Sequence, residues 1–242
     1  KTSPSVDREL YLEGNYHTSR LVDGTVRSVT HLWSNVNGIR NWVDLPEGYW
    51  SEEGKAKIEI WNQSVAETIE HNNEIISSLT LEDFAPQMYE NVESGVFVYP
   101  ASSHDCSEYS ASEYSAGRGF TTIMTLDLFG DDLEMEVDHI TSSWAHVYSS
   151  QDMLILAEPA NDWWWFWRNS DWEDATNIHS FDISEPGYTQ YIGSGRVDGT
   201  VQDQFSISEF EGSVRIASTS DAWARWWSVS YTHLRAHETY TY

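Results

Sequence analysis

The chain has 242 residues, enough for a substantial core, and an all-β domain of this length is often a single unit. Its formal net charge is -26, from 39 acidic and 13 basic residues, and a surface of that sign repels the phosphates of nucleic acids. Nucleic-acid binding is therefore excluded. No apolar run reaches the length of about eighteen residues that a transmembrane helix needs.

The acidic excess favours a solubility role, as in proteins adapted to salty water. The alternative is binding of divalent cations, but no segment has the spaced Asp and Asn ladder of a calcium loop. Cys106 is the only cysteine, so no disulfide forms within the chain. The chain opens on Lys1 with no apolar signal segment, so we expect that either a leader was removed or the start of the gene is missing. No metal site and no cofactor are predicted.

Strands dominate the first part of the chain, and short sequences recur. "LVDGTV" at residues 21–26 returns as "RVDGTV" at 196–201, "TTIMTLDL" at 121–128 aligns with "TNIHSFDI" at 176–183, and "VFVYPA" at 96–101 aligns with "ILAEPA" at 155–160. The last two pairs give a period of about 55 residues made only of strands, which is typical of the four-stranded blades of a β-propeller.

Residues 33–85 interrupt the strands as an insertion between the last strand of one blade and the first of the next. Apolar residues recur there at helical spacing, at Ile58, Trp61, Val65, Ile69, Ile76 and Leu79. The pattern predicts one amphipathic helix that packs against the disc of blades.

Two complete blades are predicted, at residues 87–142 and 143–195, with the end of one blade before them and the start of another after them. "MLILAE" at 153–158 is a continuous apolar strand, which indicates burial on both faces between stacked sheets. The Ser-rich segment 102–119 holds His104, Asp105, Cys106 and Glu108 without the spacing of a known metal site, so it is interpreted as a polar loop. His139 and His146 lie on strands and are interpreted as structural.

The segments "YLEGNYHTSRLVDGTVRSVTH", "VYSSQDMLILAE", "TNIHSFDIS" and "YIGSGRVDGTVQDQFSISEFEGSVRIAST" resemble the family of secreted prokaryotic proteins with a C-terminal β-propeller domain. The resemblance covers most of the chain to about Ser228. It implies a β-propeller fold and a secreted or cell-surface location. Together with the repeats and the helical spacing, the predicted fold class is an all-β propeller fragment with about two complete blades, partial ones and one helical insertion. It brings no catalytic or ligand-binding residue with it.

"NDWWWFWRNSDW" at residues 161–172 predicts a hairpin that projects from its blade, with a turn at residues 168–171. Alternation along the strand places Trp163, Trp165 and Trp167 on one face and Trp164 and Phe166 on the other. Both faces pack as core in one interpretation, with Trp167 paired to Trp172. In the other, one face is an open platform for sugars or a partner protein. Trp163, Trp164, Trp165, Trp167 and Trp172 are therefore the candidate ligand-binding residues.

The preferred function is a non-catalytic extracellular module that binds a polysaccharide, a surface component or a partner protein through its loop-rich rim. The alternative is a propeller hydrolase that uses carboxylates and needs blades outside this sequence to complete its site. No nucleophile elbow, phosphate loop or zinc-protease motif is present, and no catalytic residue is predicted.

Residues 229–239, "VSYTHLRAHET", match the in-frame translation of a sequencing-library adapter. We therefore expect the natural domain to cover residues 1–228 and the tail 229–242 to be non-native. This segment, with His233, His237 and Glu238, is given no role in fold or function, and the sequence is interpreted as a metagenomic fragment.

Overall fold

The computed structural model describes residues 6, 9–80, 83, 85–101, 106–113, 117, 119–130, 135–160, 174–220 and 235–240. The chain forms two compact units. One unit is the insertion Ser34–Ala85, and the other combines Lys1–Trp33 with Pro86–Tyr242. The second unit contains all the strands that the structure describes, so it is called the β unit below.

One sheet of the β unit has the strand order β2-β3-β7-β8-β6. Its first four strands pair antiparallel, and β6 adds to the edge by a short parallel pairing. The bounds are Asn15–Val22 for β2, Thr25–Trp33 for β3, Gly119–Asp127 for β7, Met135–Ser142 for β8 and Tyr109–Ser110 for β6. These four antiparallel strands form a complete blade.

A second complete blade has the order β12-β11-β10-β9. Its strands follow one another in the chain, so each pairs with its sequence neighbour. Their bounds are His146–Ser149 for β9, Met153–Pro159 for β10, Ala175–Asp182 for β11 and Gln190–Asp198 for β12.

Two three-stranded sheets complete the set, so the predicted fold class of two complete blades plus partial ones is confirmed. One has the order β1-β4-β5, with bounds Glu9–Leu12, Gln87–Val92 and Gly95–Pro100. The other has the order β13-β14-β15, with bounds Ile207–Phe210, Ser213–Ser218 and Arg235–Tyr240. Strand β15 lies within the tail 229–242 and pairs with β14, so the expectation that this tail has no part in the fold is wrong. Its origin from an adapter stays a prediction.

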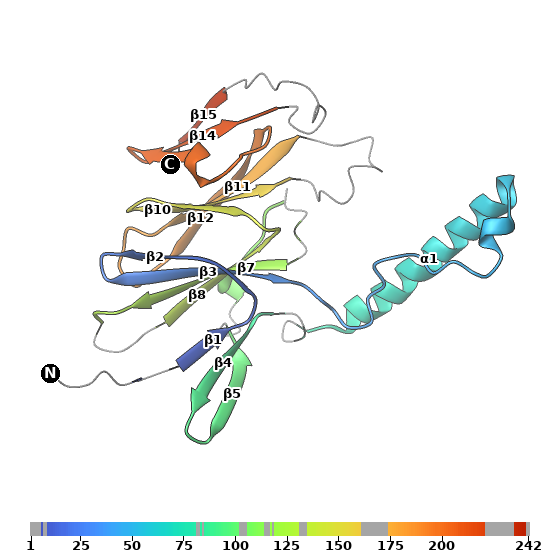
Figure 1. Cartoon of the computed structure of the whole chain (residues 1–242), viewed down its shortest axis with the longest axis horizontal. Coiled ribbons are helices and arrows are strands. Elements are labelled where there is room, and N and C mark those ends of the chain that lie inside the picture. Colours follow the sequence, from blue (N-terminus) through green and yellow to red (C-terminus); the bar gives the residue numbers. More distant parts are fainter. Residues whose placement is uncertain are drawn as a thin grey trace. The chain divides into compact units, whose positions relative to one another are not determined.

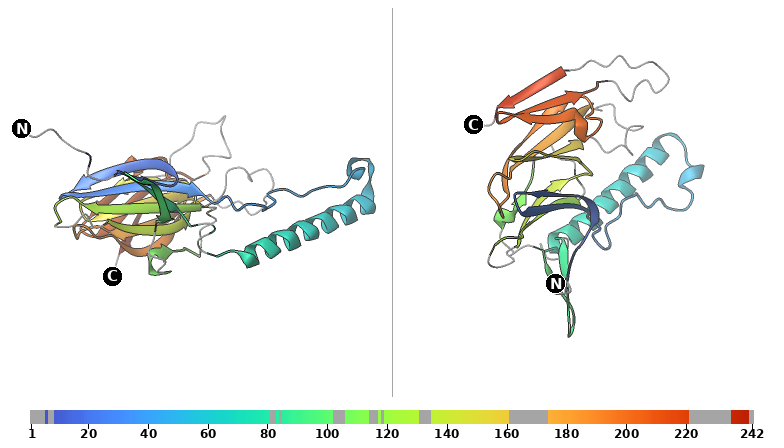
Figure 2. Two further views of the ribbon diagram at one scale, coloured as in Figure 1. Left: turned by 90° about the horizontal axis from the view of Figure 1, so that it is seen from below. Right: turned by 60° about the vertical axis from the view of Figure 1, so that its left-hand side comes forward.

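The four sheets lie face to face in one stack (Figure 1, Figure 2). Strand β10 has a hydrophobic core on each of its two faces, which holds its neighbouring sheets against it. Leu154 and Leu156 join the core against the blade of β2 and β3, whereas Met153 and Ile155 join the core against β13 and β14. Every residue from Met153 to Glu158 is buried, as a continuous apolar run in a doubly covered strand predicts.

The strand pairing corrects the predicted blade boundaries. Residues 87–142 do not form one blade, because the hairpin of β4 and β5 pairs with β1, while β7 pairs with β3. The insertion Ser34–Ala85 therefore follows β3, which is the second strand of its blade and not the last, and leads to β4 in the neighbouring sheet. A local hairpin pattern gives no information on which sheet a hairpin joins, so sequence spacing assigned it to the wrong one.

The repeated "VDGTV" also has two different structures. Asp23 and Gly24 form the two-residue turn between β2 and β3, with φ of 47° and 81°, the left-handed values that a tight hairpin requires. At the second copy β12 ends at Asp198, and Thr200 forms an isolated bridge to Thr219, the residue after β14. The two copies share turn chemistry but are not equivalent positions of a repeat.

The insertion contains the predicted helix as α1, Gly54–Ser78. The segment before it folds back on the helix: Asn72 bonds to both backbone groups of Arg40, and Tyr49 lies against Trp61. Ile58, Ile69 and Ile76 are exposed. Packing of this helix on the blades stays a prediction. Three short 3₁₀ turns complete the described elements: η1 Tyr49–Ser51, η3 Cys106–Glu108 and η5 Gln204–Ser206.

Candidate functional site

Strands β3, β10 and β14, the second strands of three of the four sheets, end at one edge of the stack, which is called the rim. The turns between β2 and β3, β9 and β10, and β13 and β14 lie at the opposite edge (Figure 1). Trp163, Trp164, Trp165, Trp167 and Trp172 belong to the connection after β10 and lie outside the described residues. Their assignment to core or platform therefore stays a prediction, as does the role of His104 and Asp105.

Four rings gather at the described part of the rim, and they are called the rim cluster. His17 comes from β2, His31 and Trp33 from β3, and Trp144 from the link between the two complete blades. His17 stacks on Trp144 at 4.4 Å, and His31 meets Trp33 edge-on at 4.6 Å between ring centroids. Trp33 is 48% exposed and Trp144 41% exposed, so two large aromatic side chains stay open to solvent.

Hydrogen bonds fix the two histidines of the rim cluster. His17 Nε2 lies 2.7 Å from the carbonyl of Ala145, and His31 Nδ1 lies 3.1 Å from Thr121 Oγ1. The second nitrogen of His31, Nε2, is buried without a partner among the described residues. Burial lowers the pKa of His31 to about 4, partly opposed by the Glu158 carboxylate. The ring therefore stays neutral at physiological pH.

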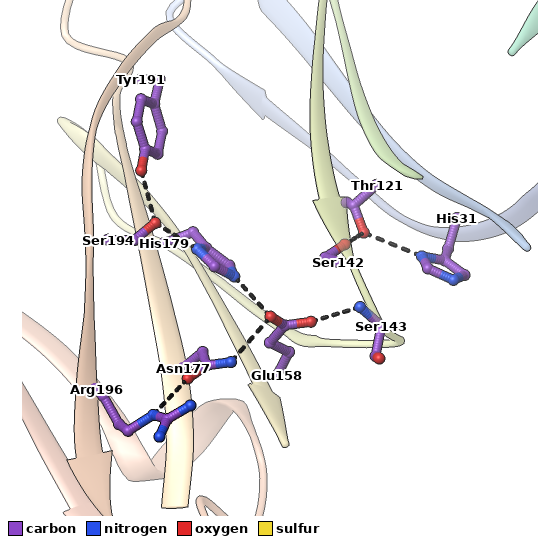
Figure 3. Close-up of polar contacts among 10 residues, drawn as sticks. All are labelled: His31, Thr121, Ser142, Ser143, Glu158, Asn177, His179, Tyr191, Ser194 and Arg196. Carbon is purple, nitrogen blue, oxygen red and sulfur yellow. Dashed lines mark hydrogen bonds and ion pairs between the residues drawn. The ribbon is translucent and has the colours of Figure 1, made fainter. Parts of the chain in front are cut away.

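Behind the rim, a polar network crosses the second blade (Figure 3). Glu158 on β10 and His179 on β11 are both 0% exposed, with His179 Nε2 3.1 Å from Glu158 Oε1. Asn177 Nδ2 donates to the same oxygen at 3.2 Å, and the Ser143 amide donates to Oε2. On the other side of the imidazole, Nδ1 lies 2.6 Å from Ser194 Oγ. A buried carboxylate is tolerated here because three donors surround it.

At the opposite edge of the same interface, Arg27 on β3 is buried. Its guanidinium donates to Thr189 Oγ1 at 3.1 Å and to the carbonyls of Glu185 and Tyr188 at 3.0 and 2.7 Å. These acceptors belong to the turn between β11 and β12, so Arg27 ties the two complete blades together. Burial lowers the pKa of Arg27, while the carboxylates of Glu136 and Asp182 raise it.

Strand β8 carries a second group of titratable residues. Burial raises the pKa of Asp138 to about 7, with further contributions from Glu136 and Glu108. His139 bonds to Thr122 Oγ1 at 2.8 Å and stacks on Tyr109, and burial lowers its pKa to about 4. Within the described ranges, no three His, Cys, Asp or Glu side chains converge to hold a metal ion.

Sequence reasoning missed the rim cluster and the Glu158–His179 pair. The residues of each come from separate strands, so no short motif joins them. One signal was present: Glu158 ends an otherwise apolar run, "MLILAE", on the same face as Leu154 and Leu156, and His179 shares a face with Phe181 in "TNIHSF". Charged or polar residues at positions that alternation assigns to the core call for partners, and here they partner each other.

Comparison with known proteins identifies the fold family. A family model described as "Beta propeller domain" matches residues 1–238. No curated protein and no solved structure matches the chain. In the part of the chain that the structure describes, no helix combines the length and apolar character needed to cross a membrane. The face-to-face blades and the family match agree, and the chain belongs to the beta propeller domain family.

Proposed function

We propose that this domain is a binding module, secreted or displayed at a cell surface, that holds a polysaccharide or another surface component at its rim. The observation that carries the proposal is the rim cluster. Trp33 and Trp144 are partly exposed at the edge that bears the long connections. Open aromatic faces of this kind suit the apolar faces of sugar rings or an apolar patch on a partner protein.

The cluster is pre-organised. His17 stacks on Trp144 and is itself anchored by the Ala145 carbonyl, so the indole loses little further freedom when a ligand covers it. The aromatic stretch from Trp163 to Trp172 joins β10 to β11 at the same edge, and it is proposed as a second part of the same surface. The net charge of -26 disfavours polyanions, so a neutral or cationic polymer is the expected ligand.

The test is retention of the purified protein on insoluble neutral polysaccharides, such as cellulose and chitin, measured by depletion from solution. Trp33→Ala and Trp144→Ala are expected to weaken retention about tenfold, the loss of about 1.4 kcal/mol that one good aromatic contact supplies. Phe129→Ala is the matched control, because Phe129 is exposed at the opposite edge of the stack. A third variant replaces Trp163, Trp165 and Trp167 together.

Two results would overturn the proposal. One is a parent protein that neither polysaccharides nor cell-wall material retains. The other is retention that Phe129→Ala weakens as much as Trp33→Ala and Trp144→Ala do. Thermal unfolding of each variant separates loss of binding from loss of fold, and triple replacement in the aromatic stretch that costs several kcal/mol of stability assigns that stretch to the core.

A further inference from the structure

The buried network of the second blade ends at a serine hydroxyl. We propose that Ser194 is the nucleophile of an ester-hydrolysing site, with His179 as its general base and Glu158 as the residue that positions His179. The substrate class is a neutral ester with a small acyl group. This inference does not depend on binding at the rim.

The direction of the hydrogen bonds carries the argument. Glu158 as a carboxylate only accepts, so the nitrogen of His179 that faces it, Nε2, must bear the proton. In the neutral imidazole Nδ1 is then an acceptor, and the Ser194 hydroxyl, 2.6 Å away, must donate to it. With His179 neutral, the serine proton therefore points at the base that would remove it, which is the arrangement of an activated serine.

Supporting contacts hold the base in place. Asn177 and the Ser143 amide also donate to Glu158, and Arg196 Nε donates to Asn177 Oδ1 at 3.0 Å. The imidazole is thus fixed in one tautomer and one orientation. Such a second layer of contacts is what an efficient general base requires, because a small displacement of the base lowers the rate strongly.

The serine is reachable from outside the sheet. Strand β12 is the edge strand of its blade, and Ser194 is only partly buried, unlike His179. An ester carbonyl can therefore approach Ser194 from the open edge of β12.

A bulge in β12 adds a further donor. The register shifts between Ser180 and Phe181, which brings Tyr191 to the same face as Ser194. The Tyr191 hydroxyl lies 2.6 Å from Ser194 Oγ, and because Ser194 donates to His179, Tyr191 donates to Ser194. When Ser194 attacks, this hydroxyl is free to donate to the oxyanion that forms beside it.

The reaction balances without a cofactor. Ser194 Oγ forms a bond to the acyl carbon, and His179 Nδ1 takes the serine proton. The ester C–O bond then breaks, and the leaving alcohol receives that proton from His179. Water attacks the acyl-enzyme, gives one proton to His179 and releases the carboxylic acid as Ser194 recovers its proton. The closeness of Tyr191 limits the acyl group to a small one, and the acidic surface favours a neutral ester.

The test uses a fluorophosphonate, which labels serines that a neighbouring base activates, followed by peptide mass spectrometry. Label on Ser194 is expected at least about a hundredfold faster than on Ser208, an exposed serine of β13, in line with the contribution of a general base. Hydrolysis of p-nitrophenyl acetate should fall about a hundredfold in Ser194→Ala and stay unchanged in Ser208→Ala. Labelling of the parent at Ser194 no faster than at Ser208 overturns the proposal, however the variants fold.

The pH dependence separates the role of Glu158 from a merely structural one. Glu158→Gln replaces the carboxylate acceptor by an amide that can turn its NH₂ group toward His179. That favours the tautomer with the proton on Nδ1, which cannot accept the proton of Ser194. In a folded Glu158→Gln variant, labelling of Ser194 should fall at least about tenfold at neutral pH, and its pH profile should move. An unchanged labelling rate and an unchanged profile contradict the assignment.

Discussion

Arg27 and His31 lie on the same face of β3, on either side of Val29, and both are buried against the second complete blade. Their surroundings differ. Arg27 makes three hydrogen bonds to the turn between β11 and β12, whereas His31 makes one and leaves Nε2 without a partner among the described residues. Strand β3 thus contacts the second blade in two ways. At the turn edge the hydrogen-bond donors of Arg27 have acceptors, whereas at the rim one ring nitrogen of His31 has no hydrogen-bond partner among the described residues.

The difference separates stability from function along one interface. Buried polar groups with partners hold a unique packing, while unpaired ones cost free energy and persist where they serve a role. The exposed Trp33 and Trp144 and the Glu158 network all lie on the His31 side of Val29. We infer that contacts at the turn edge stabilise the packing of the two blades and that the rim carries the residues that serve function.

The largest effect is expected at the turn edge. Arg27→Met removes the buried guanidinium and its three hydrogen bonds to the turn between β11 and β12, so the free energy of unfolding should fall by about 3 kcal/mol. The measurement is the urea unfolding curve. Arg215→Met, at an exposed position of β14, is the control and should cost less than about 1 kcal/mol. If the two variants lose equal free energy of unfolding, Arg27 has no special role in holding the two blades together.

A smaller effect is expected in the network behind the rim. Glu158→Gln keeps the size of the side chain but presents an amide to donors that a carboxylate satisfied, so the expected loss is about 2 kcal/mol. Glu211→Gln, in the exposed turn before β14, is the control. The measurement is the free energy of unfolding of both variants in guanidinium. A Glu158→Gln protein as stable as the parent would show that the fold does not need the carboxylate.

The smallest effect is a pH dependence at His31. Its pKa is about 4 in the folded protein and about 6.5 in an unfolded chain, so its contribution to stability is present above about pH 6.5 and is lost as the pH falls toward 4. His31→Gln should reduce the loss of stability over that range by about 1 kcal/mol, because the Gln side chain does not take up a proton. His71→Gln, in the insertion, should leave the slope unchanged.

Much of the fold could be predicted from local patterns. The continuous apolar run in β10 indicated burial on both faces, and the helical spacing from Ile58 to Leu79 predicted α1. Sheet membership could not be predicted, because β3 pairs with β7 across residues 34–118, while the intervening β4 and β5 join a different sheet. Hairpin signals extend over a few residues only, and they give no account of long-range pairing.

The candidate site was less accessible to sequence reasoning. The adjacent aromatic residues of the Trp163–Trp172 stretch form a conspicuous pattern, whereas the rim cluster unites His17, His31 and Trp144 from three separate segments. Ser194 gave no signal at all, since a serine between two glycines is an ordinary turn or edge sequence. Its relation to His179 depends on strand register and on the bulge in β12, which only the folded chain defines.

The long separation between β3 and β7 has a consequence for the route by which the domain folds. Trp33 pairs with Gly119 although residues 34–118 lie between them, so a large loop must close before that pairing gains any free energy. The second blade has no such delay, because each of its strands pairs with its neighbour in the chain. We therefore expect β9 to β12 to assemble early and to offer a surface on which β3 and β7 meet, with late protection of the β7 amides in pulsed hydrogen exchange. Simultaneous protection of β7 and β11 would contradict this order.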